Sequence, residues 1–201
     1  MSDTPLISII TPTVMRQSLL DTCRSIDEQT FSSWQHVVIV DKEEFDPSII
    51  EQIVHPQRVI VKCPKPHRNG GNTCRHNAWH FALGTFCWHV DDDNTLASPR
   101  TLQQIAKQLE KVGTDVAWTL WPIFRHGHIF FFDPPAPCYF DTGNAIVRRE
   151  FAQWPDIDDY ASDAVWLQQF KDKPYVAFPE SLPIMLMEKT SFGEGGGING
   201  E

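Results

Sequence analysis

The run Asp91-Asp92-Asp93-Asn94 has the clearest chemical potential in the chain, and it directly follows a predicted buried strand, Phe86–Val90. Three adjacent carboxylates repel one another, so they require either a bound cation or full solvation. Magnesium in proteins typically takes one or two carboxylates together with phosphate oxygens. The run therefore predicts a metal site, with a solvated acidic turn as the alternative. A calcium-binding EF-hand fits poorly, because the sixth position from Asp91 is not glycine and the twelfth is Leu102.

Two further polar residues stand where predicted strands end. Thr11 ends the apolar run Leu6–Thr11, and Asp41 follows the run His36–Val40. In open parallel sheets, ligands sit outside the carboxyl ends of the strands. We therefore expect Thr11, Asp41 and the aspartate run to surround one site.

The elements that must position these residues alternate between strands and helices. Strands are predicted at 6–11, 36–40, 58–61 and 86–90. Helices are predicted from Leu19 with Ser18 as N-cap, from Pro47-Ser48, and from Ser98-Pro99 to Val112 with Leu102, Ile105, Ala106 and Leu109 facing inward. Another helix after the loop Pro64–Asn72 would carry Cys74, Ala78 and Phe81 on one face. This alternation is typical of an α/β fold with a mostly parallel sheet flanked by helices.

The second half predicts a less regular arrangement. Asp115–Phe124 and His128–Phe132 read as strands joined near Arg125–Gly127, which favours exposed histidines at His126 and His128 over a metal site there. Phe140–Val147 reads as extended. Ser162–Phe170 has helical spacing at Val165, Leu167 and Phe170, and Leu182–Met187 reads as a last strand. No linker interrupts residues 1–190, which predicts one domain followed by a flexible glycine-rich tail at 191–201.

Composition narrows the class of protein. The 201 residues carry a formal net charge of −9, which argues against a surface that grips nucleic acid or anionic lipid throughout. The five cysteines contain no CxxC pair, so we expect free thiols in a reducing cytoplasm and neither a disulfide framework nor a structural zinc site. The N-terminus shows no signal peptide, and no apolar stretch is long enough for a membrane helix.

Two common nucleotide-binding loops are missing. A dinucleotide fold requires GxGxxG after its first strand, but that turn reads TPTVMR here, without glycine. A Walker A loop is also absent. Gly70-Gly71 would let a backbone approach phosphate, although a plain loop explains the pair equally well.

Four segments in order resemble inverting family 2 glycosyltransferases, which have the GT-A fold, a Rossmann-like α/β domain. PLISIITPTVMRQSLLDTCRSIDEQTFSSWQHVVIVD is similar to their opening strand–helix–strand unit, and GGNTCRHNAWHFALGTFCWHVDDDN to their next block. FDTGNAIVRREF and YASDAVWLQQF are similar to two later blocks. The resemblance spans about Pro5 to Phe170. The sequence differs from the common pattern at Asp41-Lys42-Glu43-Glu44, where Asp-Asp-Gly-Ser is usual, and at Ser162, where an acidic residue is usual.

The resemblance implies a role for each matching residue. Thr11 and Asp41 would contact the nucleotide base, and Arg75 would lie near base and ribose. Asp91 and Asp93 would hold a metal ion, Mn²⁺ or Mg²⁺, and the donor diphosphate, with Asp92 among the donor-binding residues. Thr142, Gly143 and Asn144 would approach the donor sugar and acceptor, and Asp163 would be the catalytic base. Residues 1–95 would then form a nucleotide-binding half and 96–190 an acceptor-binding half.

The implied activity is metal-dependent transfer of a sugar, with inversion, from a nucleoside diphosphate sugar to a hydroxyl acceptor. A carboxylate at Asp41 can accept a hydrogen bond from a pyrimidine ring N–H, which favours a UDP-sugar donor. The acceptor would be a glycan, a lipid-linked glycan or a hydroxymethylated DNA base, as in phage-type transferases. A DNA acceptor would require a basic patch drawn from Lys62, Lys65, Arg68, Arg125, Arg148 and Arg149. A non-catalytic nucleotide- or glycan-binding module is the alternative outside enzymes, and Trp121 and Trp154 are candidates to line an acceptor groove.

Overall fold

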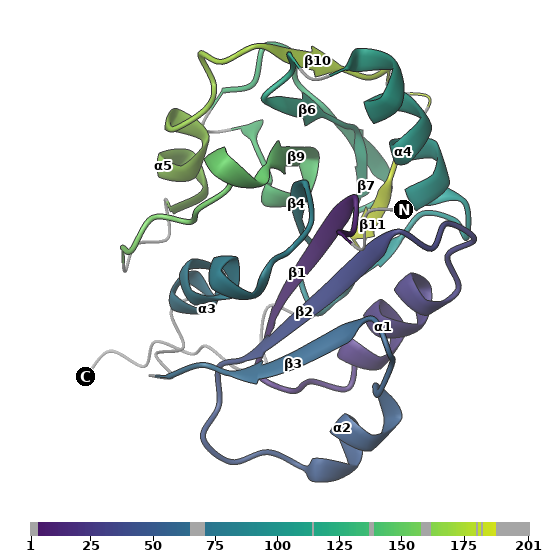
Figure 1. Cartoon of the computed structure of the whole chain (residues 1–201), viewed down its shortest axis with the longest axis vertical. Helices are drawn as coiled ribbons and strands as arrows, with labels where there is room; N and C mark the ends of the chain where they lie inside the picture. The colour runs from purple at the N-terminus through teal and green to yellow at the C-terminus, as the bar shows by residue number, and fades with distance from the viewer. Residues whose placement is uncertain are drawn as a thin grey trace.

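The computed structural model describes residues 4–64, 71–113, 115–136, 139–157, 162–179, 181 and 183–187. Within these residues the fold is built on a seven-stranded mixed sheet (Figure 1). Its strands, in spatial order, are β10 (Tyr175–Ala177), β6 (Trp118–Leu120), β9 (Ala145–Arg148), β4 (Phe86–His89), β1 (Ile7–Thr13), β2 (Trp34–Val40) and β3 (Arg58–Lys62). All neighbours pair in parallel except β9, which runs antiparallel to both β4 and β6.

Helices cover both faces of this sheet. The α-helices are α1 (Leu19–Asp27), α2 (Pro47–Gln52), α3 (Asn72–Ala78), α4 (Thr101–Val112) and α5 (Ser162–Gln168). The short 3-10 helices are η1 (Trp79–Phe81), η3 (Thr142–Asn144) and η4 (Arg149–Phe151). In Figure 1, α3 and α5 lie on one side of the sheet, and α1, α2 and α4 lie on the other. Because both faces are covered, β1 and β2 are buried at every residue, which explains their nearly continuous apolar sequences.

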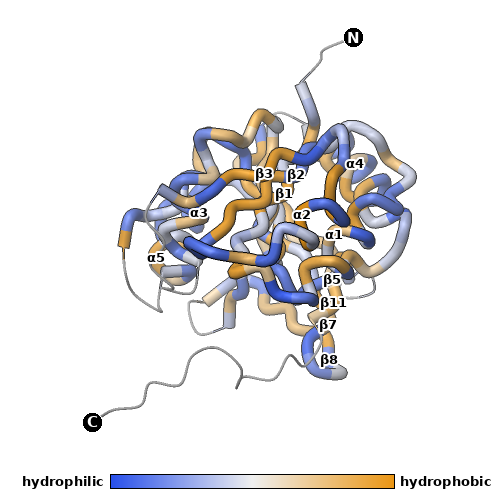
Figure 2. Tube along the Cα trace, turned by 90° about the horizontal axis from the view of Figure 1, so that it is seen from below, coloured by the Kyte–Doolittle hydropathy of each residue, from blue (hydrophilic) through white to orange (hydrophobic). Residues whose placement is uncertain are grey.

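The hydrophobic core follows from this layering. Alternate residues of β1 and β2 pack in opposite directions: Ile10 and Val37 join the cluster with α3 and α5, whereas Ile9 and Val38 join the clusters with α4, α1 and α2. In Figure 2 the tube is hydrophobic through β1, β2 and β3, and the turn between β7 and β8 is hydrophilic. The predicted α/β fold with a mostly parallel sheet is confirmed.

A smaller sheet lies beside the large one. It contains β5 (Asn94–Leu96), β11 (Met185–Met187), β7 (Ile123–Arg125) and β8 (His128–Phe130), in that spatial order. The hairpin of β7 and β8 is confirmed. The prediction of one strand over Asp115–Phe124 is wrong, because β6 belongs to the large sheet and β7 to the small one. Pro122 lies between them, and a proline has no N–H to continue a strand ladder.

Several local predictions need correction. The first strand does not end at Thr11 but continues to Thr13. Helix α4 begins at Thr101, and Ser98 instead accepts a hydrogen bond from the Arg100 N–H in the preceding turn. Ser18 stands at the N-cap of α1, but its side chain makes no capping bond. Phe81 and Val165 are exposed rather than inward-facing.

The two halves of the chain share the large sheet, since β9 inserts between β4 and β6. The predicted tail at 191–201 and most of the predicted loop at 64–72 lie outside the described residues. In the part of the chain that the structure describes, no helix is both long and apolar enough to cross a membrane.

Candidate functional site

The carboxyl ends of β1, β2 and β4 meet at one edge of the sheet. The Thr13 carbonyl, at the end of β1, accepts a hydrogen bond from the Asp41 N–H, which follows β2 (2.7 Å). Ile10 pairs with His89, so β4 ends beside β1 and delivers the aspartate run to the same edge. The predicted convergence of Asp41 and Asp91–Asp93 on one edge is therefore observed.

The three aspartates differ in their surroundings. The side chains of Asp91 and Asp93 remain 33% and 17% exposed, whereas that of Asp92 is 2% exposed. Thr13 donates a 2.6 Å hydrogen bond to Asp92 Oδ2, and the Arg16 guanidinium bonds both carboxylate oxygens. Burial raises the pKa of Asp92, and the bonds from Arg16 and Thr13 oppose that rise. Asp92 therefore ties the end of β4 to the end of β1, and Asp91 and Asp93 are the carboxylates that face outward.

Arg16 and Arg75 neutralise these outward carboxylates from opposite sides. Arg16 Nη1 lies 3.5 Å from Asp93 Oδ2, and Arg75 on α3 is ion-paired with Asp91. The Arg75 guanidinium also lies 5.0 Å from the centre of the Trp154 ring, an arrangement that fixes a planar cation. Gly71, at the N-cap of α3, has a φ of +82°, and a Cβ there would lie 3.1 Å from Arg75 Nη1. Helix α3 thus places Arg75 within reach of Asp91 through a turn that favours glycine.

Arg75 lies over the Trp154 ring, and that ring in turn contacts His89 and Trp166. His89 lies edge-on to both Trp154 and Trp166, with 5.0 Å between ring centres in each case. Among the described residues its two ring nitrogens have no hydrogen-bond partner. Burial, followed by the charge of Arg75, lowers the pKa of His89 well below its ordinary value, so the ring is neutral. Trp154 and Trp121 are both fully buried, so the prediction that they line an acceptor groove is wrong.

Asp141 is a site residue that the sequence reasoning missed. It caps η3, where its Oδ1 accepts the Gly143 N–H (2.9 Å) and the Asn144 side chain accepts the Asp141 N–H (3.1 Å). Burial and then the charge of Asp91 raise the pKa of Asp141 to about 6, against the lowering effects of Gly143, Arg125 and Arg75. A shifted carboxyl beside a charged partner marks a functional-site candidate. An aspartate directly before Thr-Gly-Asn was the available signal, since aspartate is a preferred N-cap.

The predicted segment Thr142–Asn144 forms η3 next to this site. The Gly143 carbonyl accepts the Trp88 indole N–H (3.0 Å), and Asn144 Nδ2 donates to the carbonyls of Trp121 (2.7 Å) and Phe130 (3.1 Å). The Asn144 side chain is therefore committed to backbone groups. Its geometry indicates that it holds η3 in place, while Thr142 remains partly exposed.

Asp163 is the second residue of α5 and is half-buried. Its neighbour Ser162 donates a 2.6 Å hydrogen bond to Asn72 Oδ1, which joins the start of α5 to the start of α3. Burial raises the pKa of Asp163, while hydrogen bonds to backbone N–H groups and the charges of Arg75 and Arg125 lower it. A helix N-terminus favours an ionised carboxylate, but here desolvation outweighs the favourable contacts, and the pKa of Asp163 is raised.

Arg125 is a third cation of the site, after Arg16 and Arg75. It ends β7, lies 3.6 Å from Asp141 Oδ2, and its guanidinium sits 5.4 Å from the centre of the Phe130 ring. The adjacent turn has positive φ at His126 and Gly127, and both histidines of His126-Gly127-His128 are exposed, as a hairpin turn predicts. Arg75 and Arg125 both act electrostatically on Asp141 and on Asp163. Ion pairs with Arg75 and Arg125 thus hold Asp91 and Asp141, and the charges of both arginines also act on Asp163.

Asp41 and Thr11 lie in different surroundings. Asp41 is buried at the end of β2 next to Cys63 and Cys74. Thr11 lies within β1, and its hydroxyl hydrogen-bonds His36 Nε2 (3.0 Å), whose Nδ1 accepts from buried Arg58 (2.9 Å). The Thr11 side chain therefore belongs to a buried network, and Thr13 is the β1 threonine that reaches the site.

The basic residues that a DNA acceptor would require lie in different places. Arg148 pairs with Phe86 at the start of β4, at the other end of that strand from Asp91, and its guanidinium lies over the Phe86 ring. Arg149 lies over the Trp79 ring, and among the described members of this set Arg125 is the one with an ion pair to a residue of the site. Lys65 and Arg68 fall outside the described residues. The described members of the set therefore do not all lie at the aspartate run.

Comparison with known proteins identifies the family. A family model described as Glycosyl transferase family 2 matches residues 8–136, more than half of the chain. The chain belongs to glycosyl transferase family 2. No curated protein matches it.

Solved structures share the GT-A fold of this family 2 chain. S. aureus TarS 1-349 in complex with UDP has a TM-score of 0.72 at 15% identity, with 90% of this chain and 59% of that chain covered. TarS 1-349 in complex with UDP-GlcNAc gives 0.68 at 16%, with 90% and 57% covered. Mannosyltransferase PcManGT from Pyrobaculum calidifontis, in complex with GDP-Man and Mn²⁺, gives 0.71 at 17%, with 94% and 59% covered. This chain thus spans less than two thirds of each of these structures.

The donor set of this family 2 chain suits a hard divalent cation. Asp91 and Asp93 offer carboxylate oxygens at the surface, and Asp141 has a raised pKa partly because Asp91 is near. A cation would relieve that repulsion. An ion of this kind takes one or two protein carboxylates and completes its shell with phosphate oxygens and water, so Asp91 and Asp93 would provide enough protein ligands.

Proposed function

We propose that this chain is a metal-dependent inverting glycosyltransferase that moves a sugar from a nucleoside diphosphate sugar to a hydroxyl acceptor. One set of contacts carries the proposal: at the carboxyl edge of the sheet, Arg75 is ion-paired with Asp91 and Arg125 lies 3.6 Å from Asp141. The charges of both arginines also act on Asp163 of α5. Family membership and the UDP, UDP-GlcNAc and GDP-Man complexes of the structural neighbours support a nucleotide-sugar donor.

Asp91 and Asp93 would hold the divalent cation, Mn²⁺ or Mg²⁺, with the donor diphosphate. When bound, such an ion neutralises the charge that builds on a departing diphosphate. Arg75 holds Asp91 in place, and Arg16 holds Asp93 and Asp92, so the carboxylates are preorganised before the donor arrives. Asp41, at the end of β2, would accept a hydrogen bond from the base, which favours uridine.

Asp163 would take the proton from the attacking hydroxyl as the new bond forms. It lies on α5, a different element from the β4 end that carries Asp91, so the base and the leaving diphosphate would be held apart. Direct attack from the face opposite the leaving group inverts the anomeric carbon. The raised pKa of Asp163 strengthens it as a base, while Arg75 and Arg125 favour its ionised form.

Two alternative functions have less support. A hydroxymethylated DNA base as acceptor loses support because the basic residues it would require lie in different places, with Arg148 at the far end of β4. A non-catalytic nucleotide- or glycan-binding module would need no positioned base, yet α5 is anchored to α3 through Ser162 and Asn72 beside Asp163. Sugar transfer to a hydroxyl other than that of a DNA base accounts for both observations.

A thermal-shift panel tests the proposal. UDP, GDP, CDP and UDP- and GDP-sugars are each added with and without Mn²⁺, because a ligand that binds only the folded state raises the melting temperature. We expect a shift with at least one nucleoside diphosphate that requires Mn²⁺, and the largest with UDP. No shift with any nucleotide in the presence of Mn²⁺ would refute the proposed donor class.

A further inference from the structure

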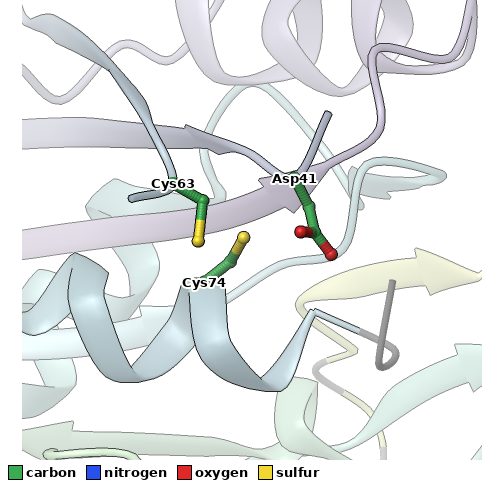
Figure 3. Close-up of side chains that lie close together, drawn as sticks. All are labelled: Asp41, Cys63 and Cys74. Atoms are coloured by element: carbon green, nitrogen blue, oxygen red, sulfur yellow. The ribbon is translucent and has the colours of Figure 1, made fainter. Parts of the chain in front are cut away.

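Three side chains that commonly bind metals meet next to the aspartate site. They are Asp41 after β2, Cys63 after β3 and Cys74 on α3, and their ligand atoms all lie within 4.8 Å of one another (Figure 3). In the figure the two sulfur atoms point toward each other, with the carboxylate beside them. All three residues are buried. The sequence did not predict this cluster, because Cys63 and Cys74 stand eleven positions apart and do not form a CxxC motif. The fold brings them together.

The cluster is positioned by the ends of β2 and β3 and by helix α3, which also carries Arg75. The Cys63 N–H donates to the Val40 carbonyl (2.9 Å), which places Cys63 directly beside Asp41 at the end of the sheet. Cys74 is the third residue of α3, one position before Arg75. The four described cysteines form no disulfide.

A pocket lies against one member of the cluster, Cys63. It has a volume of about 480 Å³ and is lined by Glu43, Glu44, Lys62, Cys63 and Pro64. Two of these residues are glutamates, whose negative charge attracts cations from solvent. Glu43 and Glu44, which depart from the usual family sequence, thus line the same pocket as one thiol of the pair, together with Lys62.

We propose that Asp41, Cys63 and Cys74 form a site for a thiophilic divalent cation of the Zn²⁺ class. Thiolate sulfur and carboxylate oxygen are both established ligands of Zn²⁺, and three protein ligands leave one coordination position for water from the pocket. On binding, each thiol gives its proton to solvent as its sulfur–metal bond forms, so no oxidant is needed. Because sulfur is a soft ligand, this site favours thiophilic metals, whereas Asp91 and Asp93 offer only oxygen and favour hard cations.

Occupancy would affect donor binding, a consequence that rests on the proposed function. Asp41 is the proposed contact to the nucleotide base, and a cation bound to its carboxylate takes the lone pairs that the base would use. The cation and the nucleotide would therefore compete, and the thiophilic cation would act as an inhibitor of donor binding.

Cadmium titration of the reduced, metal-free protein tests the site. Cd²⁺ bound to thiolate gives a charge-transfer absorption in the ultraviolet that oxygen ligands do not give. All proteins carry Cys138→Ser, because Cys138 lies outside the described residues. We expect one equivalent of Cd²⁺ to saturate the band, Cys63→Ser and Cys74→Ala each to abolish it, and Cys23→Ser, the matched buried control, to keep it. Asp41→Asn should weaken Cd²⁺ affinity by at least about tenfold.

Absence of the band, or its persistence in folded Cys63→Ser, overturns the site, and near-ultraviolet circular dichroism verifies folding of each variant. The coupling is tested separately by UDP affinity in excess Mn²⁺, with and without one equivalent of Cd²⁺. Weaker UDP binding that Cys63→Ser restores supports competition, and equal affinity overturns it. If UDP does not bind even without Cd²⁺, the proposed donor fails while the charge-transfer band still decides the metal site.

Discussion

Arg75 is ion-paired with Asp91 while its guanidinium lies 5.0 Å from the centre of the Trp154 ring. The arginine is almost fully buried, yet its partner carboxylate is one-third exposed. A buried cation thus holds an accessible anion, which is the arrangement needed to present a carboxylate to a ligand. The same arginine lowers the pKa of both Asp141 and Asp163.

Replacing Arg75 should therefore alter both stability and titration. Arg75→Gln should raise the pKa of Asp141 above its present value of about 6, because one of the two nearby cations is lost. It should also lower the free energy of unfolding by about 2 kcal/mol, as expected when a charged hydrogen bond is lost. Arg75→Lys should keep the titration but lose part of the stability, since lysine lacks the planar fork.

Carboxyl NMR titration and urea unfolding measure these effects. Arg24→Gln is the matched control, because Arg24 forms an exposed pair with Asp21 and should change stability by less than about 0.5 kcal/mol. An unchanged pKa of Asp141 in Arg75→Gln would show that the two residues are not coupled.

Asp141 should make the protein less stable as pH rises. Its pKa in the folded state, about 6, lies above its ordinary value of 3.8, so the folded state binds the proton more tightly than the unfolded state does. The stabilisation is complete below pH 3.8 and is lost as pH rises through 6. Asp141→Asn cannot ionise and should remove this part of the pH dependence.

Urea unfolding at pH 4 and pH 7 tests this assignment. Wild type should lose about 1–3 kcal/mol more than Asp141→Asn between the two pH values. Asp156→Asn, an exposed aspartate nearby in sequence, should follow wild type. Parallel pH profiles of wild type and Asp141→Asn would mean that another group is responsible.

Gly71 should tolerate a side chain less well than a glycine of similar backbone conformation. Gly71 and Gly113 have φ values of +82° and +70°, so alanine is strained at both positions. A Cβ at Gly71 would also lie 2.8 Å from Pro12 Cβ and 3.1 Å from Arg75 Nη1, whereas nothing lies within 4 Å at Gly113. Gly71→Ala should therefore cost about 1–3 kcal/mol more than Gly113→Ala in urea unfolding. Equal costs would mean that α3 shifts freely and that Gly71 does not fix Arg75.

Asp163→Asn should abolish most turnover and leave donor binding intact. Loss of a positioned general base typically lowers the rate by about a hundredfold to ten-thousandfold. Because burial raises the pKa of Asp163, the wild-type rate should fall as pH drops through that raised pKa, where the base becomes protonated. Release of nucleoside diphosphate from the sugar nucleotide is the readout. Asp172→Asn, whose side chain is 84% exposed, is the control.

A rate for Asp163→Asn within about threefold of wild type, well short of that range, would assign the residue to the helix end alone. The base would then have to be sought elsewhere, with Asp158 and Asp159, which lie outside the described residues, as the next candidates.

Local sequence patterns predicted the elements that long-range contacts do not alter. The apolar runs of β1 to β4 and the spacing of α4 indicated a parallel sheet between helices, and the aspartate run was placed at the correct strand end. The different surroundings of the three aspartates were not predictable from the sequence. Asp92 differs from its neighbours because it accepts hydrogen bonds from Thr13 and Arg16, which stand more than seventy positions earlier in the chain. The apolar run predicted a strand that ends at Thr11, yet β1 continues through Pro12 to Thr13, and Thr13 is the residue that bonds Asp92.

Other site features depend on contacts that no local pattern encodes. The raised pKa of Asp141 arises from burial and from Asp91, fifty positions earlier in the chain. The proximity of Cys63 and Cys74 requires β3 and α3 to meet beside Asp41. The sequence made Trp154 a candidate to line an acceptor groove, but in the structure its ring is in contact with Arg75, His89 and Trp166.

The proposal that Asp91 and Asp93 bind the donor diphosphate through a divalent cation is tested most directly by calorimetry. UDP and GDP are titrated into wild type, Asp93→Asn and the exposed control Asp21→Asn, each with Mn²⁺ and with a chelator. We predict that chelation weakens wild-type binding by at least about tenfold, that Asp93→Asn loses affinity similarly in Mn²⁺, and that Asp21→Asn matches wild type. Equal nucleotide affinity with and without Mn²⁺, or unchanged affinity in Asp93→Asn, would contradict it.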